Sequence, residues 1–134
     1  MKVKSMTSTS TLFSLEDEYE SELLHIRVDK HSKTLFKTDR LRLILITMNA
    51  GATLSRHSAP GPITIQPVGG RFTVSVEGGA THILRRNEIV AIEAGVPHSV
   101  AAGEDGAFLL SIAWPESRDN ETSTIDQDVI VLQH

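Results

Sequence analysis

Short runs of alternating apolar and polar residues, each closed by a turn-forming segment, extend from residue 33 to residue 114. A two-residue period is typical of β-strands with one buried face, and Gly, Pro and Asn at the interruptions favour tight turns. No helical period separates the runs, so the pattern predicts an antiparallel all-β sandwich or barrel. The strand-like runs are KTLFKTD, RLRLILITMN, PITIQPV, RFTVSVE, THILRR, EIVAIEA, HSVAA and AFLLSIAW.

The segment before the strands differs in pattern. Residues 1–13 are rich in Ser and Thr and predict a flexible N-terminus, and residues 14–32 predict a helical lead-in. Ser14 suits a helix N-cap, and acidic residues follow it in the first turn, where they interact favourably with the helix dipole. We therefore expect a short amphipathic helix over about 15–25.

The segment after the strands, residues 115–134, reads as an acidic tail. Its last apolar run, Val129 to Leu132, predicts either one more strand, which a partner subunit could take up, or a partly ordered end. The tail carries the excess negative charge of a chain whose formal net charge is −4. The tail has one basic residue, Arg118, and the acidic residues Glu116, Asp119, Glu121, Asp126 and Asp128.

Charge and composition limit the classes of partner. A neutral body with an acidic tail repels a nucleic-acid backbone, so we expect no nucleic-acid partner. No apolar run approaches the roughly 18 residues that span a membrane, and no secretory h-region follows the N-terminus, so we expect no membrane partner. The chain has no cysteine, which fits a cytoplasmic location. The expected partners are a small molecule and a second copy, as a homodimer.

Two histidines lie in segments framed by turn-forming residues. The first segment, GATLSRHSAPGPITIQPVGG, begins at Gly51, carries His57 after five intervening residues and ends at Gly70. The second, NEIVAIEAGVPHSV, begins at Asn87 and carries His98 just after a Gly-Val-Pro turn. Imidazole is a common protein ligand for zinc, iron, copper and nickel, so these segments form the candidate functional site.

The order and spacing of these residues resemble the two motifs of the cupin superfamily. The overall sequence pattern of the two segments resembles that of small single-domain bacterial cupins of unassigned activity. Cupins hold a divalent metal with two close histidines and a glutamate from the first motif and one histidine from the second. The resemblance implies a cupin-type double-stranded β-helix (jelly-roll) barrel over residues 33–114, with a short N-terminal helix. His57 and His98 match ligand positions of the family.

Other ligand positions of the motifs are altered in this chain. Ala59 stands at the second histidine position, and the glutamate position falls on Ile63 or Thr64. A third donor must then come from elsewhere. Gln66 is the first choice, because it lies two residues past Thr64 and side chains in a strand alternate. Pro67 lacks the N–H of a strand ladder, so it indicates an edge, bulge or break that either turns Gln66 inward or spoils this alternation.

These residues lead to one main hypothesis and two alternatives. The main hypothesis is a small-molecule pocket that holds a divalent transition metal (Zn, Fe, Mn, Ni or Cu) through His57, His98 and Gln66, with His82 as the next candidate donor. The alternatives are a metal-free ligand-binding or sensing module and a dimeric interaction module without catalysis. The sequence assigns no catalytic residue and leaves open whether the chain is an enzyme. Further candidate ligand-binding residues are Thr64, His82, Phe108, Leu110, Ile112 and Trp114.

Overall fold

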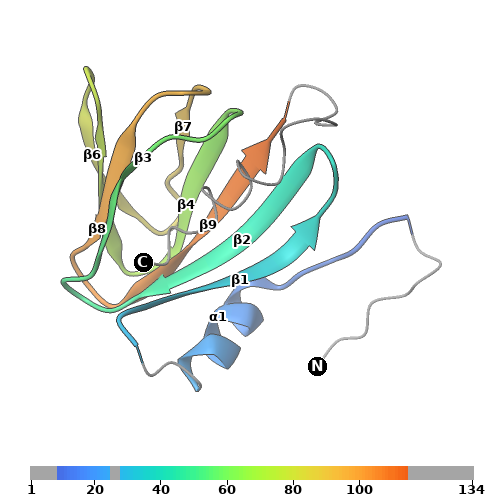
Figure 1. Ribbon diagram of the computed structural model, residues 1–134. Helices are drawn as coiled ribbons and strands as arrows, with labels where there is room; N and C mark the ends of the chain where they lie inside the picture. Colours follow the sequence, from blue (N-terminus) through green and yellow to red (C-terminus); the bar gives the residue numbers. More distant parts are fainter. Residues whose placement is uncertain (1–8, 25–27, 115–134) are drawn as a thin grey trace.

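The structure, a computed structural model, describes residues 9–24 and 28–114 (Figure 1). In this part of the chain one helix, α1 (Leu15–Leu23), precedes nine strands. No helix of the described part is long and apolar enough to cross a membrane. The predicted acidic tail, with its apolar run from Val129 to Leu132, lies outside the described residues, as do residues 1–8 of the predicted N-terminus.

The nine strands form two sheets that face each other (Figure 1). One sheet has the order β1-β2-β9-β4-β7 and the other the order β3-β8-β5-β6, and the strand pairs are antiparallel. This arrangement confirms the expected all-β jelly-roll barrel. The strands are β1 (Lys30–Lys37), β2 (Leu41–Met48), β3 (Thr53–His57), β4 (Ile63–Gly69), β5 (Arg71–Val76), β6 (Thr81–Arg85), β7 (Val90–Ile92), β8 (His98–Ala102) and β9 (Gly106–Ala113).

The core fills the space between the two sheets. Because side chains of a strand alternate between its faces, every second residue of the central strands points into the barrel. Phe72 on β5 and Phe108 on β9 are at most 1% exposed, and their rings meet edge to face across the barrel with centroids 5.1 Å apart. This aromatic pair joins the two sheets at the centre of the core.

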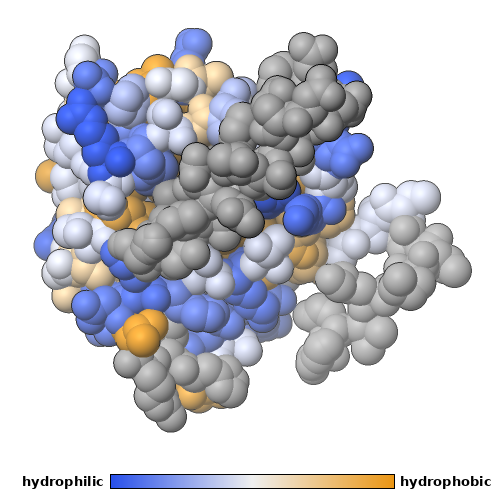
Figure 2. Space-filling view, in the orientation of Figure 1, coloured by the Kyte–Doolittle hydropathy of each residue, from blue (hydrophilic) through white to orange (hydrophobic). Residues whose placement is uncertain are grey.

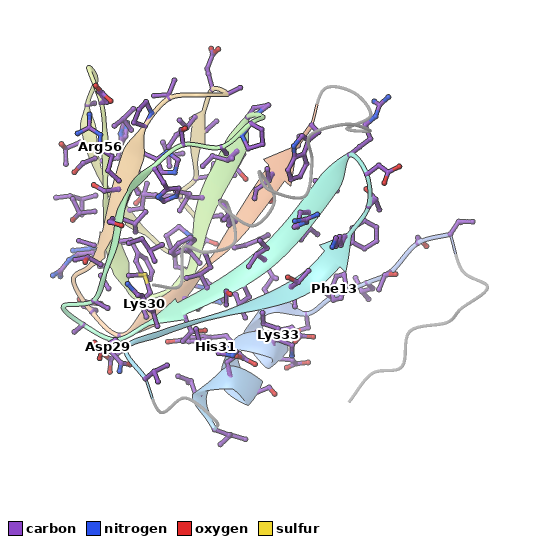
Figure 3. All side chains as sticks on the ribbon, viewed as in Figure 1. Phe13, Asp29, Lys30, His31, Lys33 and Arg56 are labelled. Carbon is purple, nitrogen blue, oxygen red and sulfur yellow. The ribbon has the colours of Figure 1, made fainter. Side chains whose placement is uncertain are left out.

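Helix α1 covers the outer face of the five-stranded sheet, where it contacts β2 and β4 and lies next to β1 (Figure 1). The side chain of Ser14 accepts a hydrogen bond from the Asp17 N–H at 3.2 Å, which confirms the predicted N-cap. Lys33 on β1 lies next to α1 (Figure 3), and its Nζ is 2.8 Å from Glu18 Oε1. Leu45 on the outer face of β2 is fully buried in a second apolar cluster to which the helix contributes.

Turns with positive φ separate several strands. Asn87, with φ of 73°, is the one non-glycine residue of the described part with a positive φ. Asparagine is among the few residues that tolerate this left-handed backbone conformation. Gly51, Gly70 and Gly95 also have positive φ, between 80° and 91°. The Gly and Asn residues that frame the two sequence motifs therefore lie in turns where the backbone needs a residue that adopts a positive φ.

The face of the molecule seen in Figure 2 is mainly polar. Figure 2 shows that hydrophilic side chains dominate the visible face and that hydrophobic ones form small, separate groups. Scattered apolar side chains are normal on protein surfaces. The exposed large hydrophobic residues of the described part are Leu12, Leu23, Leu24, Val28, Ile83 and Ile89.

Candidate functional site

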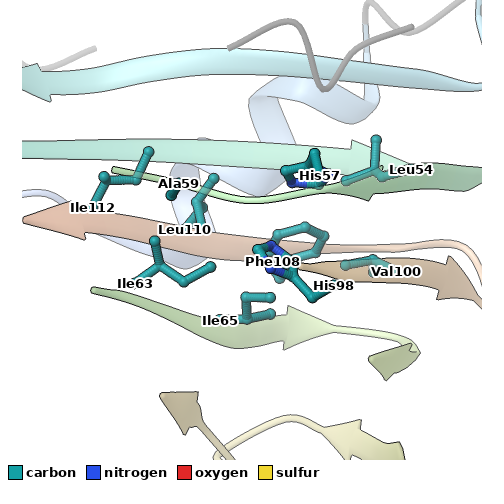
Figure 4. Close-up of a pocket in the computed structure, with 10 residues that line it drawn as sticks. All are labelled: Leu54, His57, Ala59, Ile63, Ile65, His98, Val100, Phe108, Leu110 and Ile112. Carbon is teal, nitrogen blue, oxygen red and sulfur yellow. The ribbon is translucent and has the colours of Figure 1, made fainter. Parts of the chain in front are cut away.

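A pocket opens inside the barrel between the two sheets (Figure 4). Its cavity measures about 10 Å³, which is room for about one water molecule. All the lining residues except two histidines are apolar. The lining residues are Leu54, His57, Ala59, Ile63, Ile65, His98, Val100, Phe108, Leu110 and Ile112.

The two histidines of the pocket lie side by side on neighbouring strands. His57 ends β3 and His98 begins β8, and the two are direct cross-strand partners. Residues opposite each other on antiparallel strands point to the same face, so both rings meet inside the barrel. Their centroids are 4.5 Å apart and their planes meet at 62°. The predicted pairing of His57 with His98 is thus what the structure shows.

Backbone carbonyls fix the orientation of both rings. His57 Nδ1 lies 2.7 Å from the Ser55 carbonyl oxygen, and His98 Nδ1 lies 3.0 Å from the Val96 carbonyl oxygen. A carbonyl oxygen only accepts hydrogen bonds, so we assign the proton of each neutral ring to Nδ1, which donates. Nε2 of each ring then carries a lone pair that can accept a hydrogen bond or bind a metal ion.

The pocket keeps both rings neutral near pH 7. Burial lowers the pKa of His57, although its hydrogen bond to Ser55 acts in the opposite direction. Burial also lowers the pKa of His98, against the hydrogen bond to Val96, and the nearby His57 ring lowers it further. A neutral pair offers two basic nitrogens to a ligand and no positive charge.

These lowered pKa values predict a pH-dependent stability. Because each histidine has a lower pKa in the folded state than in the unfolded chain, the unfolded chain takes up protons first as the pH falls. Stability is therefore fully present above about pH 6.5, the pKa of an unperturbed histidine, and is lost as the pH falls through the folded-state pKa. The slope is at most about 1.4 kcal/mol per pH unit for each ring.

Urea denaturation at several pH values checks this expectation. We expect the pH dependence below about pH 6.5 to be weaker in the double variant His57→Gln, His98→Gln than in the wild type. The single variants His57→Gln and His98→Gln each remove one ring, and each should show a slope between those of the wild type and the double variant. Equal slopes in the wild type and the double variant would contradict the assignment.

The predicted third donor lies elsewhere. Ile63 and Ile65 of β4 line the pocket, so the alternate residues Thr64 and Gln66 point to the opposite face of the sheet. The cross-strand partner of Gln66 is Leu109, which packs in the outer cluster with α1. The interpretation that Thr64 points inward is therefore wrong, and Gln66 does not join the histidines.

The bulge expected near Pro67 is present but does not change this outcome. The register between β4 and β9 shifts between Pro67 and Gly69, after Gln66. On its other side β4 pairs with β7 only from Ile63 to Ile65, so Pro67 lies beyond that ladder. Proline has no N–H to donate, and at this position no β7 carbonyl needs one, so the ladder between β4 and β7 loses no hydrogen bond.

Only some of the other predicted ligand-binding residues line the pocket. Phe108, Leu110 and Ile112 point inward from β9 and line the pocket. Trp114 is buried in the same core but does not line the pocket. His82 lies on β6, an edge strand, and is also absent from the lining.

The donor set fits a metal ion only in part. Two neutral imidazoles with free Nε2 lone pairs are suitable ligands, but protein metal sites commonly supply three or more. Within residues 9–24 and 28–114 no group of three His, Asp or Glu side chains is placed to hold a metal ion. Ala59 stands where the resemblance to cupins implied the second histidine, and Ile63 is one of the two residues where it implied the glutamate. Both contribute apolar side chains to the pocket wall.

Sequence reasoning missed one interior residue near the pocket. Arg42 on β2 is 0% exposed, and its guanidinium carbon lies 5.3 Å from the centroid of the Trp114 ring. This is a cation–π distance. The structure places it in alternation with Ile44 and Ile46, which both face the core, but β2 is apolar on both faces and its sequence does not mark the inner one.

The comparisons with known proteins agree with this architecture. No protein-family model and no curated protein matches the chain. A conserved protein of unknown function from Streptococcus pyogenes has a similar structure, with a TM-score of 0.68 and 23% identity over 87% of this chain and 98% of the other. An uncharacterised protein from Klebsiella pneumoniae with a double-stranded β-helix domain has a TM-score of 0.68 and 18% identity, over 88% of this chain and 95% of the other.

A third solved structure connects the fold to a named superfamily. The cupin superfamily protein from Desulfitobacterium hafniense matches with a TM-score of 0.65 and 16% identity, over 85% of this chain and 99% of the other. At such identities the likeness concerns the fold. It agrees with the two facing antiparallel sheets and with the motif frame at the turns. The chain therefore has the double-stranded β-helix fold of the cupin superfamily.

Proposed function

We propose that the barrel binds a small, mainly apolar molecule that donates a hydrogen bond to His57 or His98. The observation that carries this proposal is an apolar pocket in which two neutral imidazoles supply the only polar side chains of the lining. A ligand donor such as a hydroxyl group gains a hydrogen bond only at an Nε2 lone pair. Elsewhere in the wall it would be buried without a partner, which is unfavourable.

The size of the pocket limits how such a molecule binds. The cavity has room for about one water molecule, so one small group of the ligand enters it without rearrangement of the wall. Any larger apolar part lies at the open mouth of the pocket or requires the apolar wall to move. The preferred ligand is therefore a compact molecule with its donor at one end.

A matched pair of probes tests this function. Phenol can donate a hydrogen bond and anisole, its methyl ether, cannot. We expect the wild type to bind phenol about fivefold more tightly than anisole, which corresponds to one net hydrogen bond. Titrations followed through the imidazole nitrogen signals in NMR, and by calorimetry, give both affinities.

The control variants locate the effect. In the double variant His57→Phe, His98→Phe we expect phenol and anisole to bind equally, whereas His82→Phe should keep the phenol preference. An absent preference in the wild type would count against the proposal, and so would a preference that survives in the double variant.

A divalent metal ion held by the same two histidines is the second candidate. It is favoured by the two Nε2 lone pairs on rings whose centroids are 4.5 Å apart. Solvent or the ligand would complete the coordination, and the ion would supply Lewis-acid chemistry when bound. Zinc titration of tag-free protein separates the candidates. If the histidines hold a metal ion, the wild type takes up about one zinc ion per chain and the double variant His57→Phe, His98→Phe takes up none. If the pocket is metal-free, zinc uptake is the same in both proteins.

A further inference from the structure

Strand β6 forms one edge of the four-stranded sheet (Figure 1). Its ladder with β5 is regular, with no bulge from Thr81 to Arg85. At the start of this hairpin Val76 donates its N–H to the carbonyl oxygen of Ala80, and hydrogen-bonded pairs alternate along an antiparallel ladder. The N–H and C=O groups of Thr81, Ile83 and Arg85 therefore point away from β5, towards the open edge of the sheet.

Two residues of this edge have backbone groups to which a further strand can bond. Glu88 closes the Arg85 end, because its side chain accepts the Arg85 N–H at 2.8 Å and its own N–H donates to the Arg85 carbonyl oxygen at 3.0 Å. Within residues 9–24 and 28–114, the structure shows no such partner for Thr81 or Ile83 on this side. The Ile83 side chain is 62% exposed, so an apolar group accompanies these backbone groups at the edge.

The other edges of the described sheets are protected against strand pairing. Natural sheets blunt their edges with lysines, bulges or very short strands. Strand β1 has three lysines among its eight residues and a bulge, β3 has a bulge, and β7 has only three residues. Strand β6 has no lysine, no proline and no bulge. This contrast indicates that the β6 edge is kept open for a partner strand.

We infer that β6 pairs with β6 of a second copy of the chain, antiparallel and about a twofold axis at His82. In this register Thr81 of each copy lies opposite Ile83 of the other, so the edge-directed N–H and C=O groups of both residues are all paired. A register centred on Ile83 would instead need the N–H of Arg85, which the Glu88 side chain already accepts. The two four-stranded sheets then join into one continuous sheet.

The side chains along the edge fit this pairing. On the outer face of the joined sheet, Ile83 of one copy packs against the methyl group of Thr81 of the other. No two Lys, Arg, Asp or Glu side chains oppose each other in this register. Arg85 of one copy lies opposite Gly79 of the other, in the turn that also carries the acidic Glu77. A surface that is complementary to itself is what a twofold dimer requires.

The interface is small and separate from the pocket. Two short strands bury less than the roughly 800 Å² per partner of a standard stable complex, so we expect a reversible dimer with a Kd on the order of 100 μM. No residue of β6 lines the pocket, so the inference goes beyond the proposed function and does not depend on it.

Analytical ultracentrifugation of the full-length protein tests the inference. We expect the wild type to change from monomer to dimer between about 10 μM and about 1 mM. Ile83→Lys places on this edge the residue that protects other edges, and it should weaken dimerisation about tenfold or more. Thr34→Lys introduces the same residue at an exposed position of the β1 edge and should leave dimerisation unchanged.

Two results of this experiment overturn the inference. A wild type that stays monomeric at about 1 mM does so even if a variant fails to fold, and it leaves the edge to an extended segment of another protein. Dimerisation that Ile83→Lys leaves unchanged also does so, because the interface between the copies then lies elsewhere.

Single cysteines test the register, since the natural chain has none. In the proposed pairing His82 opposes itself in a non-hydrogen-bonded pair, whose Cα atoms are about 4.5 Å apart, within the range that a disulfide bridges. Ile83 lies diagonally from its counterpart, about 7–8 Å away, which is beyond that range. Under mild oxidation we expect His82→Cys to form disulfide-linked dimers about tenfold faster than Ile83→Cys or the β1 control Thr34→Cys. Equal rates, or faster linkage of Ile83→Cys, overturn the proposed pairing.

Discussion

Replacement of Gly61 by alanine is expected to lower the free energy of unfolding by about 3 kcal/mol or more. A Cβ at this position would overlap with the carbonyl oxygen of Ala113 and would stand 3.3 Å from the Trp114 Cα. These are backbone atoms at the end of β9, so no side-chain rotation relieves the overlap. The loop after β3 or the end of β9 has to move, and both border the candidate site.

Gly79→Ala is the matched control for this prediction. The nearest atoms to a Cβ there belong to Val76, at 3.8 Å, which is ordinary contact. Its effect should stay within about 0.5 kcal/mol, as for most surface substitutions. Urea denaturation measures both variants, and Trp114 fluorescence shows whether the end of β9 has shifted. A Gly61→Ala protein as stable as Gly79→Ala would mean that this loop has room to move.

Phe108→Ala is expected to lower the free energy of unfolding by about 3–5 kcal/mol and to enlarge the pocket. The Phe108 ring is 1% exposed and meets Phe72 of the opposite sheet at an interplanar angle of 78°. Its removal takes away an aromatic contact between the sheets and leaves a cavity that the rigid strands fill only in part. Because Phe108 lines the pocket, the new space joins the ligand cavity.

Phe72→Ala separates the effect on stability from the effect on binding. Phe72 is 0% exposed and belongs to the same ring pair, but it does not line the pocket. Both variants should lose similar stability in urea denaturation, whereas only Phe108→Ala should bind a larger probe such as 2-naphthol more tightly than the wild type does. Equal gains in both variants would show that the cavity extends past Phe108 to the centre of the core.

Much of the fold follows from local features of the sequence. The two-residue period and the turn residues predicted the strands, and Ser14 predicted the start of the helix, because these depend on neighbouring residues. The order β3-β8-β5-β6 pairs segments that are distant in the chain, and a period carries no information on pairing. The jelly-roll class came from the resemblance to cupin motifs, whose frame residues occupy turns such as those at Asn87 and Gly95, and the individual strand pairings were not predicted.

The two histidines of the candidate site could be predicted because turn residues at fixed spacings position them. His57 and His98 follow from the motif frame, and the structure makes them cross-strand partners. Gln66 was misplaced because the family pattern assigned Thr64 to the interior. The apolar residues Ile63 and Ile65 already indicated the opposite alternation, since the apolar face of a strand covers the core.

Arg42 was missed for a different physical reason. On β2 both faces are buried, because the inner face fills the barrel and the outer face, with Leu45, lies under α1. A strand that is apolar on both faces shows no alternation that would mark one residue as interior. The sequence of β2 therefore left open which face receives the single arginine within the run.

The hydrogen bonds from Nδ1 of His57 and His98 to backbone carbonyls have a consequence for recognition. Each ring is already held in one rotamer by a carbonyl two residues earlier in the chain. A ligand therefore meets acceptors that lose little rotational entropy on binding, whereas a free side chain would lose about 0.5–1.5 kcal/mol. A small group that binds at the two histidines should therefore leave their ring orientations unchanged, whereas a larger group has to move the apolar wall around them.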